Sequence, residues 1–307
     1  MQKQKNNGPL WITLGSLLWG TDSVFRKSLV NVLPTGIIVF YEHCIGSFIA
    51  LPILIKKFRE LLPLSWKEWL GLIFISLGGS VIATLLFTAA FSYINPSIII
   101  VLQKLQPIIT ISIAYFFLKE RFEIGFWKYA ILALVGAYIL AFDLLKNLSF
   151  NNANFRGVLF AITATVLWGC STVVGKKLSA KISFPLLTSA RVSLGFFFLF
   201  PIVIIRGYSF TITIQQFQSL LFIAIIPGVT ALFLYYRGLS TTKASIASIC
   251  ELAFPISSII LNWYFLGATL TPYQIVGSII ILYAITMLSI QQQRNKHSPQ
   301  EQFILDN

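Results

Sequence analysis

The sequence contains little charge, cysteine or histidine for its length. Only 11% of its 307 residues are Asp, Glu, Lys or Arg, whereas soluble domains carry about 25%. Three Cys in such a chain make no disulfide framework, and two His provide no metal-binding pair of the H-E-x-x-H kind. These shortages exclude a soluble globular protein, a secreted disulfide scaffold and an intramembrane metalloprotease. We expect no metal and no cofactor.

Apolar side chains are abundant: 56% of the residues are hydrophobic, 27 are Phe, and the mean hydropathy is +0.81. Residues 69–103 and 252–293 hold no charged side chain, and each stretch is long enough for two helices of the ~20 residues that cross a bilayer. The sequence therefore predicts an all-α polytopic membrane protein. Apolar runs between Pro, Gly and charged residues predict ten spans, at residues 9–28, 34–55, 69–91, 97–118, 126–145, 157–175, 184–205, 217–236, 244–265 and 272–291.

The basic side chains are distributed unevenly between the two sides of these spans. If the N-terminus is inside, sixteen of the 23 Lys and Arg residues fall in cytoplasmic segments, and five fall on the opposite side. This excess follows the positive-inside rule, so we expect both termini to be cytoplasmic and the first span to be retained. The net charge of +13 then reflects membrane topology, with the lipid bilayer and not nucleic acid as the partner.

The chain repeats itself at an offset of 149 residues, which becomes 148 after one deletion. Leu and Ile could match by chance in two apolar segments, but Trp, Gly and Pro rarely would. The matches include Trp19-Gly20 with Trp168-Gly169, Gly79 with Gly228, and Pro107 with Pro255.

Each repeat holds five predicted spans, and an odd number makes the second repeat enter the membrane from the other side. Two inverted five-helix repeats are typical of secondary transporters, whose substrate site lies near the midplane between the repeats. We predict a first repeat at residues 1–147, a second at residues 154–291 and a polar cytoplasmic tail at residues 292–307.

On these residues the chain resembles the ten-span, EamA-type transporters of the drug/metabolite transporter superfamily. The resemblance implies export of small metabolites, commonly amino acids or related compounds, through a bacterial inner membrane. It also implies that the first four spans of each repeat line a central cavity. The segments that carry it are Leu17-Leu18-Trp19-Gly20, Val166-Leu167-Trp168-Gly169, Leu105-Gln106-Pro107, Phe117-Leu118-Lys119-Glu120-Arg121 and Glu251-Leu252-Ala253-Phe254-Pro255.

Ionisable side chains inside spans are the first candidates for a site, because burying a charge in a bilayer costs at least about 2.5 kcal/mol. Glu42 and Arg191 are equivalent in the repeat, and Lys104 and Glu251 are nearly so. Because each couple has opposite charges, we expect at least one to form an ion pair that opens as the cavity changes side. A permanent structural pair and snorkelling near span ends are the alternatives. The five candidates are Asp22, Glu42, Lys104, Arg191 and Glu251.

These groups also have chemical roles to offer a substrate. Arg191 or Lys104 could bind a substrate carboxylate, Arg by a two-pronged hydrogen-bonded fork. Burial favours the uncharged form of a carboxyl group, so Glu251, Glu42 or His43 could carry a coupling proton. Both proton-coupled and facilitated transport agree with this pattern.

Neutral side chains complete the predicted site. Gln103 and Gln106 lie on one helical face around Lys104 and are expected to line the cavity. Trp19 and Trp168 lie deeper than an interfacial aromatic belt and either wall the cavity or pack between helices. Pro107 and Pro255 each remove a backbone hydrogen bond, which predicts a helix kink.

The sequence predicts a secondary transporter that exports small polar metabolites, such as amino acids, by alternating access. The alternative is a translocase of lipids or lipid-linked metabolites on the same scaffold, with a cationic head-group pocket that Lys104 and Arg191 could supply. An enzyme is not expected, since the chain has no G-x-S-x-G elbow, P-loop or dinucleotide fingerprint.

Overall fold

The computed structural model consists of helices joined by turns and short loops in the part of the chain that it describes, which is residues 7–94, 99, 102–122, 124–140, 155–266 and 271–295. The α-helices of the first repeat are α1 (Gly8–Trp19), α2 (Asp22–Val30), α3 (Thr35–Lys57), α4 (Trp66–Ile73), α5 (Ala83–Ala90), α7 (Gln106–Phe117) and α8 (Ile124–Leu140). Those of the second are α10 (Phe155–Leu178), α11 (Phe184–Ile205), α12 (Ile214–Ile223), α13 (Ala231–Leu239), α14 (Ala244–Cys250), α15 (Phe254–Leu266) and α16 (Pro272–Asn295). They are joined by the 3-10 helices η1 (Phe58–Leu61) and η5 (Glu251–Ala253) and by the π-helices η2 (Phe74–Ile82) and η4 (Ala224–Thr230).

The all-α membrane fold predicted from the sequence is confirmed. Seven helices in the described residues are long and apolar enough to cross a membrane, and α7 and α8 are shorter apolar helices. The first predicted span differs from expectation, because it is broken between α1 and α2 at Gly20-Thr21. Residues 95–98 around the end of the third and the start of the fourth predicted span, residues 267–270 between the ninth and tenth, and the tail from residue 296 onward lie outside the described residues.

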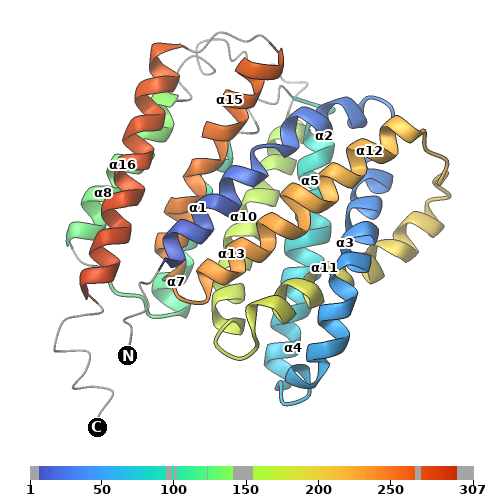
Figure 1. Cartoon of the computed structure of the whole chain (residues 1–307), viewed down its shortest axis with the longest axis horizontal. Coiled ribbons are helices and arrows are strands. Elements are labelled where there is room, and N and C mark those ends of the chain that lie inside the picture. Colours follow the sequence, from blue (N-terminus) through green and yellow to red (C-terminus); the bar gives the residue numbers. More distant parts are fainter. Residues whose placement is uncertain are drawn as a thin grey trace.

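The helices run between two ends of one bundle (Figure 1), and α1 begins at the same end at which α16 finishes. Their packing follows the repeat. Helix α1 packs along α13, and its counterpart α10 packs along α5. The second spans of the two repeats, formed by α3 and α11, pack on each other. The fifth spans, formed by α8 and α16, do so as well. This pairing is what a two-fold axis in the membrane plane requires of an inverted repeat.

Irregular backbone also recurs at equivalent places in the two repeats. The third and eighth spans each begin with a capping box, formed by Ser65 with Glu68 and by Thr213 with Gln216. Both spans then pass through a π-helix, η2 and η4, whose positions differ by about the repeat offset. Such π-helical segments inside longer helices are rare and frequent at functional sites.

The fourth and ninth spans are interrupted at matching places as well. A turn at Lys104-Leu105 precedes α7, and the single 3-10 turn η5 separates α14 from α15. Pro107 and Pro255 are each the second residue of the helix that follows, a position where the missing N–H of proline has no helical acceptor to lose. At the second break the hydroxyl of Ser16 on α1 donates to the backbone carbonyl of Glu251 at 2.8 Å.

Carboxylates from the first repeat hold the starts of two helices in the second. Glu60 accepts a hydrogen bond of 2.8 Å from the backbone N–H of Ser183, just before α11. Glu120 accepts bonds from the backbone N–H groups of Ala244 and Ser245 at the start of α14. A negative charge suits the positive end of a helix dipole, so these contacts fix the two helices that lead to Arg191 and Glu251.

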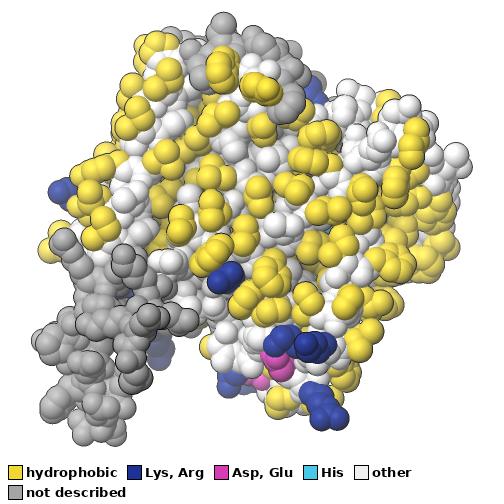
Figure 2. Space-filling model, viewed as in Figure 1, with side chains coloured by type: hydrophobic (Ala, Val, Ile, Leu, Met, Phe, Trp, Pro, Cys, Tyr) yellow, Lys and Arg dark blue, Asp and Glu magenta, His cyan; other side chains and the backbone are white. Residues whose placement is uncertain are grey.

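The outside of the bundle is largely apolar. Figure 2 shows hydrophobic side chains spread over the middle and upper part of the visible face, with most of the visible charged groups near its lower end. Large side chains such as Phe48, Phe116, Phe197 and Tyr264 are exposed to more than half of their area. Lipid tails rather than water are the medium that such a surface fits.

Candidate functional site

A cavity of about 210 Å³ lies between the two repeats and is lined by spans one to four and six to nine. Neither α8 nor α16, the fifth span of each repeat, contributes a lining residue. Of the residues predicted from the sequence, Pro255 does not line the cavity. Those that do are Trp19, Asp22, Glu42, His43, Gln103, Lys104, Gln106, Pro107, Trp168, Arg191 and Glu251.

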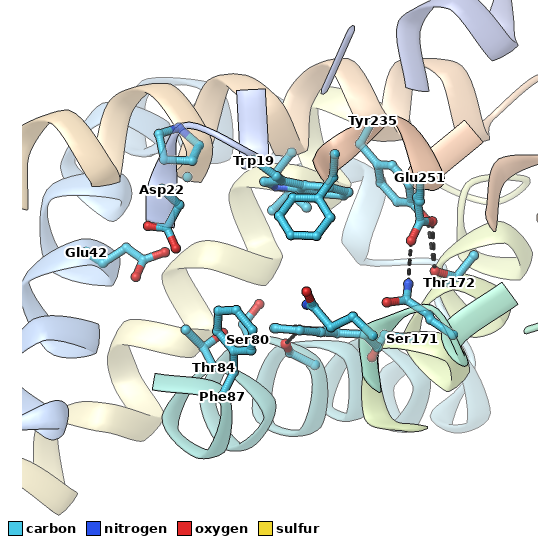
Figure 3. Close-up of a pocket in the computed structure, with 18 of the residues that line it drawn as sticks. Trp19, Asp22, Glu42, Ser80, Thr84, Phe87, Ser171, Thr172, Tyr235 and Glu251 are labelled. Carbon is cyan, nitrogen blue, oxygen red and sulfur yellow. Dashed lines mark hydrogen bonds between the residues drawn. The ribbon is translucent and has the colours of Figure 1, made fainter. Parts of the chain in front are cut away.

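One end of the cavity is acidic and contains an ion-pair triad. Arg26 donates from Nε to Asp22 Oδ2 at 2.5 Å and from Nη2 to Glu42 Oε2 at 2.8 Å. Its Nη1 donates to Thr88 Oγ1 at 2.9 Å, and the side chain is only 3% exposed. The guanidinium is therefore saturated by its neighbours. Asp22 and Glu42 lie side by side at this end in Figure 3.

Glu251 is held at the other end of the cavity by neutral donors (Figure 3). Tyr235 donates its hydroxyl to Glu251 Oε1 at 2.8 Å, and Thr172 reaches the same oxygen at 3.5 Å. The amide of Gln106 donates to Oε2. Because Glu251 comes from the turn η5 and Gln106 begins α7, this cluster joins the interrupted spans of the two repeats.

At least one of two couples, Glu42 with Arg191 or Lys104 with Glu251, was expected to form an ion pair, and neither is paired in this structure. Glu42 pairs with Arg26 rather than with Arg191, because Arg26 lies one helical turn after Asp22 on α2 and turns inward with it. Arg26 is one of the five basic residues that the positive-inside count placed on the non-cytoplasmic side. Within the described residues Lys104 has no carboxylate partner, and its Nζ lies 5.4 Å from the ring centroid of Phe254.

Arg191 is buried, being 7% exposed, and is oriented by hydroxyl groups. Its Nε donates to Ser80 Oγ at 2.7 Å and its Nη1 to the Tyr236 hydroxyl at 2.8 Å. Its guanidinium carbon lies 5.8 Å from the centroid of the Tyr236 ring. All of these partners are neutral.

Aromatic rings form the walls between the two ends. Trp19 lies against Tyr235, with ring centroids 5.1 Å apart, and Trp168 lies edge-on to Phe87 at 5.0 Å. The indole N–H of Trp168 donates to the carbonyl oxygen of Gly79 at 2.8 Å, which ties this wall to the π-helix η2. Figure 3 shows Trp19 across the cavity from Ser80 and Phe87.

Two further predicted residues have distinct environments. His43 is buried, and its Nδ1 donates to the carbonyl oxygen of Val39 at 2.9 Å. Gln103 has a buried Oε1 without a hydrogen-bond partner. A lone buried acceptor on a cavity wall is a place where a solute or a water molecule can donate.

Sequence reasoning missed several lining side chains, including Arg26, Ser80, Ser171 and Thr172. For Arg26 a signal existed, because it follows Asp22 by four residues and that spacing places both on one helical face. The hydroxyl residues gave no comparable signal, since Ser and Thr within apolar helices often bond to their own backbone. Their orientation toward the cavity depends on tertiary packing.

The sequence matches the EamA-like transporter family over residues 6–142 and 155–290, which is most of the chain. The chain belongs to the EamA-like transporter family. Its resemblance to the ten-span EamA type is thereby confirmed, and it is a multi-pass membrane protein of a family of transporters with a small-molecule substrate.

Individual members of the EamA-like family are similar to this chain along nearly its whole length. The riboflavin transporter ImpX of Fusobacterium nucleatum is 28% identical, with 92% of this chain and 97% of the relative covered. The uncharacterized transporter YwfM of Bacillus subtilis is 26% identical, with 94% of this chain and 95% of the relative covered. PecM of Dickeya dadantii is 24% identical, with 93% of this chain and 94% of the relative covered.

A solved crystal structure shares the fold, with a TM-score of 0.78 and 16% sequence identity. The match covers 96% of this chain and 100% of the chain in that crystal structure. The likeness supports the arrangement of helices and carries no argument about the solute.

Proposed function

We propose that this EamA-like transporter moves a small planar solute, with riboflavin as the first candidate, by alternating access to the cavity between its repeats. The observation that carries the proposal is the pairing of aromatic walls with polar ends in that cavity. Trp19 and Trp168 occupy equivalent positions on opposite repeats, and both line it. The 28% identity to a riboflavin transporter over nearly the full length of both chains supports the same solute.

A flavin suits this chemistry in each of its parts. Its fused ring system is flat and conjugated, and aromatic contacts of this kind contribute about 0.5–1.5 kcal/mol beyond the area they bury. Its ring carbonyls and N–H group need polar partners, which Gln103, Arg191 and the Glu251 cluster offer. A buried polar group without a partner is unfavourable, so these side chains select a solute that satisfies them.

An amino acid is the second candidate, favoured by the opposite charges in the cavity. Arg191 and Lys104 suit a carboxylate, and Asp22 and Glu42 suit an ammonium group. An aromatic amino acid would also use the indole walls. Export of such metabolites is the expectation from the sequence, with both termini in the cytoplasm.

The conformational change required for alternating access has plausible pivots in this backbone. The π-helices η2 and η4 and the breaks before α7 and α15 face the cavity at equivalent positions. Discontinuous helices of this kind surround the substrate sites of secondary transporters. We infer that the two repeats rock against each other about these segments.

The test is transport by the purified chain in proteoliposomes, with radiolabelled riboflavin as the probe. Wild type is expected to take up riboflavin saturably, with inhibition by unlabelled riboflavin and not by phenylalanine. The Glu251→Gln variant should lose uptake, and Glu68→Gln, a carboxylate outside the cavity, serves as its matched control. Uptake of phenylalanine alone would replace the first candidate by the second. Movement of a labelled lipid alone would overturn both in favour of a lipid translocase.

Direction and coupling need two further readouts. Cells that overexpress the chain should enrich their medium in the solute if transport is outward, and should accumulate it if transport is inward. An imposed pH gradient across the vesicles should accelerate uptake if protons are coupled. An unchanged rate would assign facilitated transport.

A further inference from the structure

Two pairs of cavity residues occupy equivalent positions in the two repeats and have opposite chemistry. The offset of 149 relates Asp22 to Ser171 and Glu42 to Arg191. In the first repeat the pair is acidic, and in the second it consists of a hydroxyl and a guanidinium. All four residues line the cavity, so their side chains break the symmetry of the repeat at the place where a solute would bind.

The acidic pair, with Arg26 between its members, has an acceptor to spare. Asp22 uses Oδ2 for its bond to Arg26, while its other oxygen, Oδ1, is buried and has no hydrogen-bond partner. Arg26 supplies one positive charge against two carboxylates. We call these residues, Asp22 and Glu42 with Arg26, the acceptor pole.

The second pair has donors to spare. The Oγ of Ser171, a residue that is only 2% exposed, has no hydrogen-bond partner. Arg191 uses Nε and Nη1 on Ser80 and Tyr236, and within the described residues its Nη2 makes no hydrogen bond. We call Ser171 and Arg191 the donor pole.

Gly79 shows that the two donors lie close together. A Cβ added at residue 79 would lie 2.9 Å from Arg191 Nη2 and would also collide with Ser171 Oγ. The missing side chain therefore lets both groups approach the backbone of η2 at one point. A donor pair at a single point is suited to one oxygen atom or to the two oxygens of a carboxylate.

No carboxylate in the described part of the chain lies within ion-pair distance of Arg191. Glu251 also belongs to the cavity, but both of its oxygens already accept hydrogen bonds from Tyr235, Thr172 and Gln106. A buried cation without a contacting counter-charge is unfavourable. A solute oxygen at the donor pole would remove that penalty.

We propose that the two poles orient the solute, with its acceptor or anionic end at Ser171 and Arg191 and its donor or cationic end at Asp22 and Glu42. This inference rests on the proposed transport site. For riboflavin it places the ring carbonyls at the donor pole and the hydroxyl chain at the acceptor pole. For an amino acid it places the carboxylate and the ammonium group in the same order.

Small aromatic probes test the poles independently of the natural solute. Benzoate carries only an anionic end, and benzylammonium carries only a cationic end. Equilibrium binding of each radiolabelled probe is measured on the full chain in lipid nanodiscs, for wild type, Ser171→Ala and Asp22→Asn. The matched control is Ser189→Ala, a buried hydroxyl on α11 that bonds to Pro185 and does not line the cavity.

Ser171→Ala should weaken benzoate binding about tenfold, the effect of losing a hydrogen bond to a charged group, and leave benzylammonium binding unchanged. Asp22→Asn should weaken benzylammonium binding about tenfold and leave benzoate binding unchanged. Ser189→Ala should change the binding of neither probe. If Asp22→Asn fails to fold, Glu42→Gln takes its place. The proposal is overturned if neither probe binds wild type, if both variants affect both probes alike, or if the pattern is reversed.

Competition by riboflavin separates the two proposals. If riboflavin displaces both probes, the poles and the solute belong to one site. If each variant weakens only its expected probe and riboflavin displaces neither probe, the proposed orientation stands and riboflavin as the solute is wrong. If riboflavin is transported while the variants leave both probes unaffected, the transport proposal stands and the poles are wrong.

Discussion

The two repeats of this transporter agree in the irregular backbone of their third and fourth spans and differ in their charges. The third and eighth spans share a capping box and a π-helix, and Trp19 and Trp168 line the cavity from equivalent positions. In contrast, Glu42 of α3 corresponds to Arg191 of α11. The first is paired with Arg26, and the second has only neutral partners.

The difference separates two requirements of a transporter. Movement between two equivalent states requires a backbone with similar pivots in each repeat, and an inverted repeat provides them. Recognition of one solute in one orientation requires polar groups that are not equivalent. The predictions below therefore change one repeat and compare it with its counterpart.

The largest expected effect is on stability, from Arg26→Gln. The change leaves the Asp22 and Glu42 carboxylates without their cation, and breaking such a buried pair lowers the free energy of unfolding by about 3–5 kcal/mol. Arg191→Gln removes a cation that has no carboxylate partner, so it should reduce binding with little loss of stability. Thermal unfolding of both purified variants in detergent measures the difference, and equal losses would contradict it.

A matched set of changes sharpens this first comparison. Adding Asp22→Asn and Glu42→Gln to Arg26→Gln makes the triad neutral, and these two added changes keep the shape of the carboxylates that they replace. Much of the lost stability should return, because the buried charges that caused the loss are gone. Arg206→Ala, an exposed arginine after α11, controls for the loss of a positive charge alone.

The next effect is on transport, from Glu251→Gln. The new amide group would turn an N–H toward Gln106 or Tyr235, which both donate to Glu251. Losing a hydrogen bond to a charged group lowers the rate at least about tenfold. Combining Glu251→Gln with Gln106→Glu exchanges the two roles and should restore much of the activity. A double variant as inactive as the single one would show that the carboxylate must reside on η5.

A smaller effect is expected from Gly79→Ala at the donor pole. Its Cβ would collide with the Arg191 and Ser171 side chains, and overpacking of this kind reduces affinity for the solute about tenfold. Gly78→Ala is the matched control, because its nearest contact would be an ordinary 3.4 Å to Phe74. The affinity of each variant for riboflavin is measured by the quenching of tryptophan fluorescence as riboflavin is added. Equal affinities of the two variants would contradict the assignment of the donor pole.

The smallest effects are expected at the aromatic walls, from Trp19→Phe and Trp168→Phe. Each should raise the KM for riboflavin about threefold, because a smaller ring gives up part of its contact with the solute. Trp168→Phe should have the larger effect, since it also loses the hydrogen bond to the Gly79 carbonyl. A change in KM for only one of the two variants would show that the solute lies against a single wall.

The fold was predictable from the sequence because its signals are strong and local. Apolar runs predict helices, and matched Trp, Gly and Pro residues reveal the repeat. The break between α1 and α2 was not predicted, although the polar run Gly20-Thr21-Asp22-Ser23 interrupts the apolar pattern there and such residues often mark a turn. The paired π-helices had no sequence signal beyond the matching glycines and Pro227 in η4, whose missing N–H interrupts α-helical hydrogen bonding.

The site was predictable in its members and not in its contacts. Intramembrane charge pointed to Glu42, Arg191, Lys104 and Glu251, and the structure places all of them on the cavity. The repeat predicts which residues are equivalent, but it does not determine helix rotation. The partner of Glu42 is therefore Arg26 and not Arg191. The partners of Glu251 are neutral donors and not Lys104.

The most direct test of the account is the structure of the chain with bound riboflavin, determined in lipid nanodiscs. The account predicts density for the ring system between Trp19 and Trp168, with a ring carbonyl within hydrogen-bond distance of Ser171 and the hydroxyl chain toward Asp22. Density on the lipid-facing surface, or an empty cavity at a saturating concentration that supports transport, would contradict it.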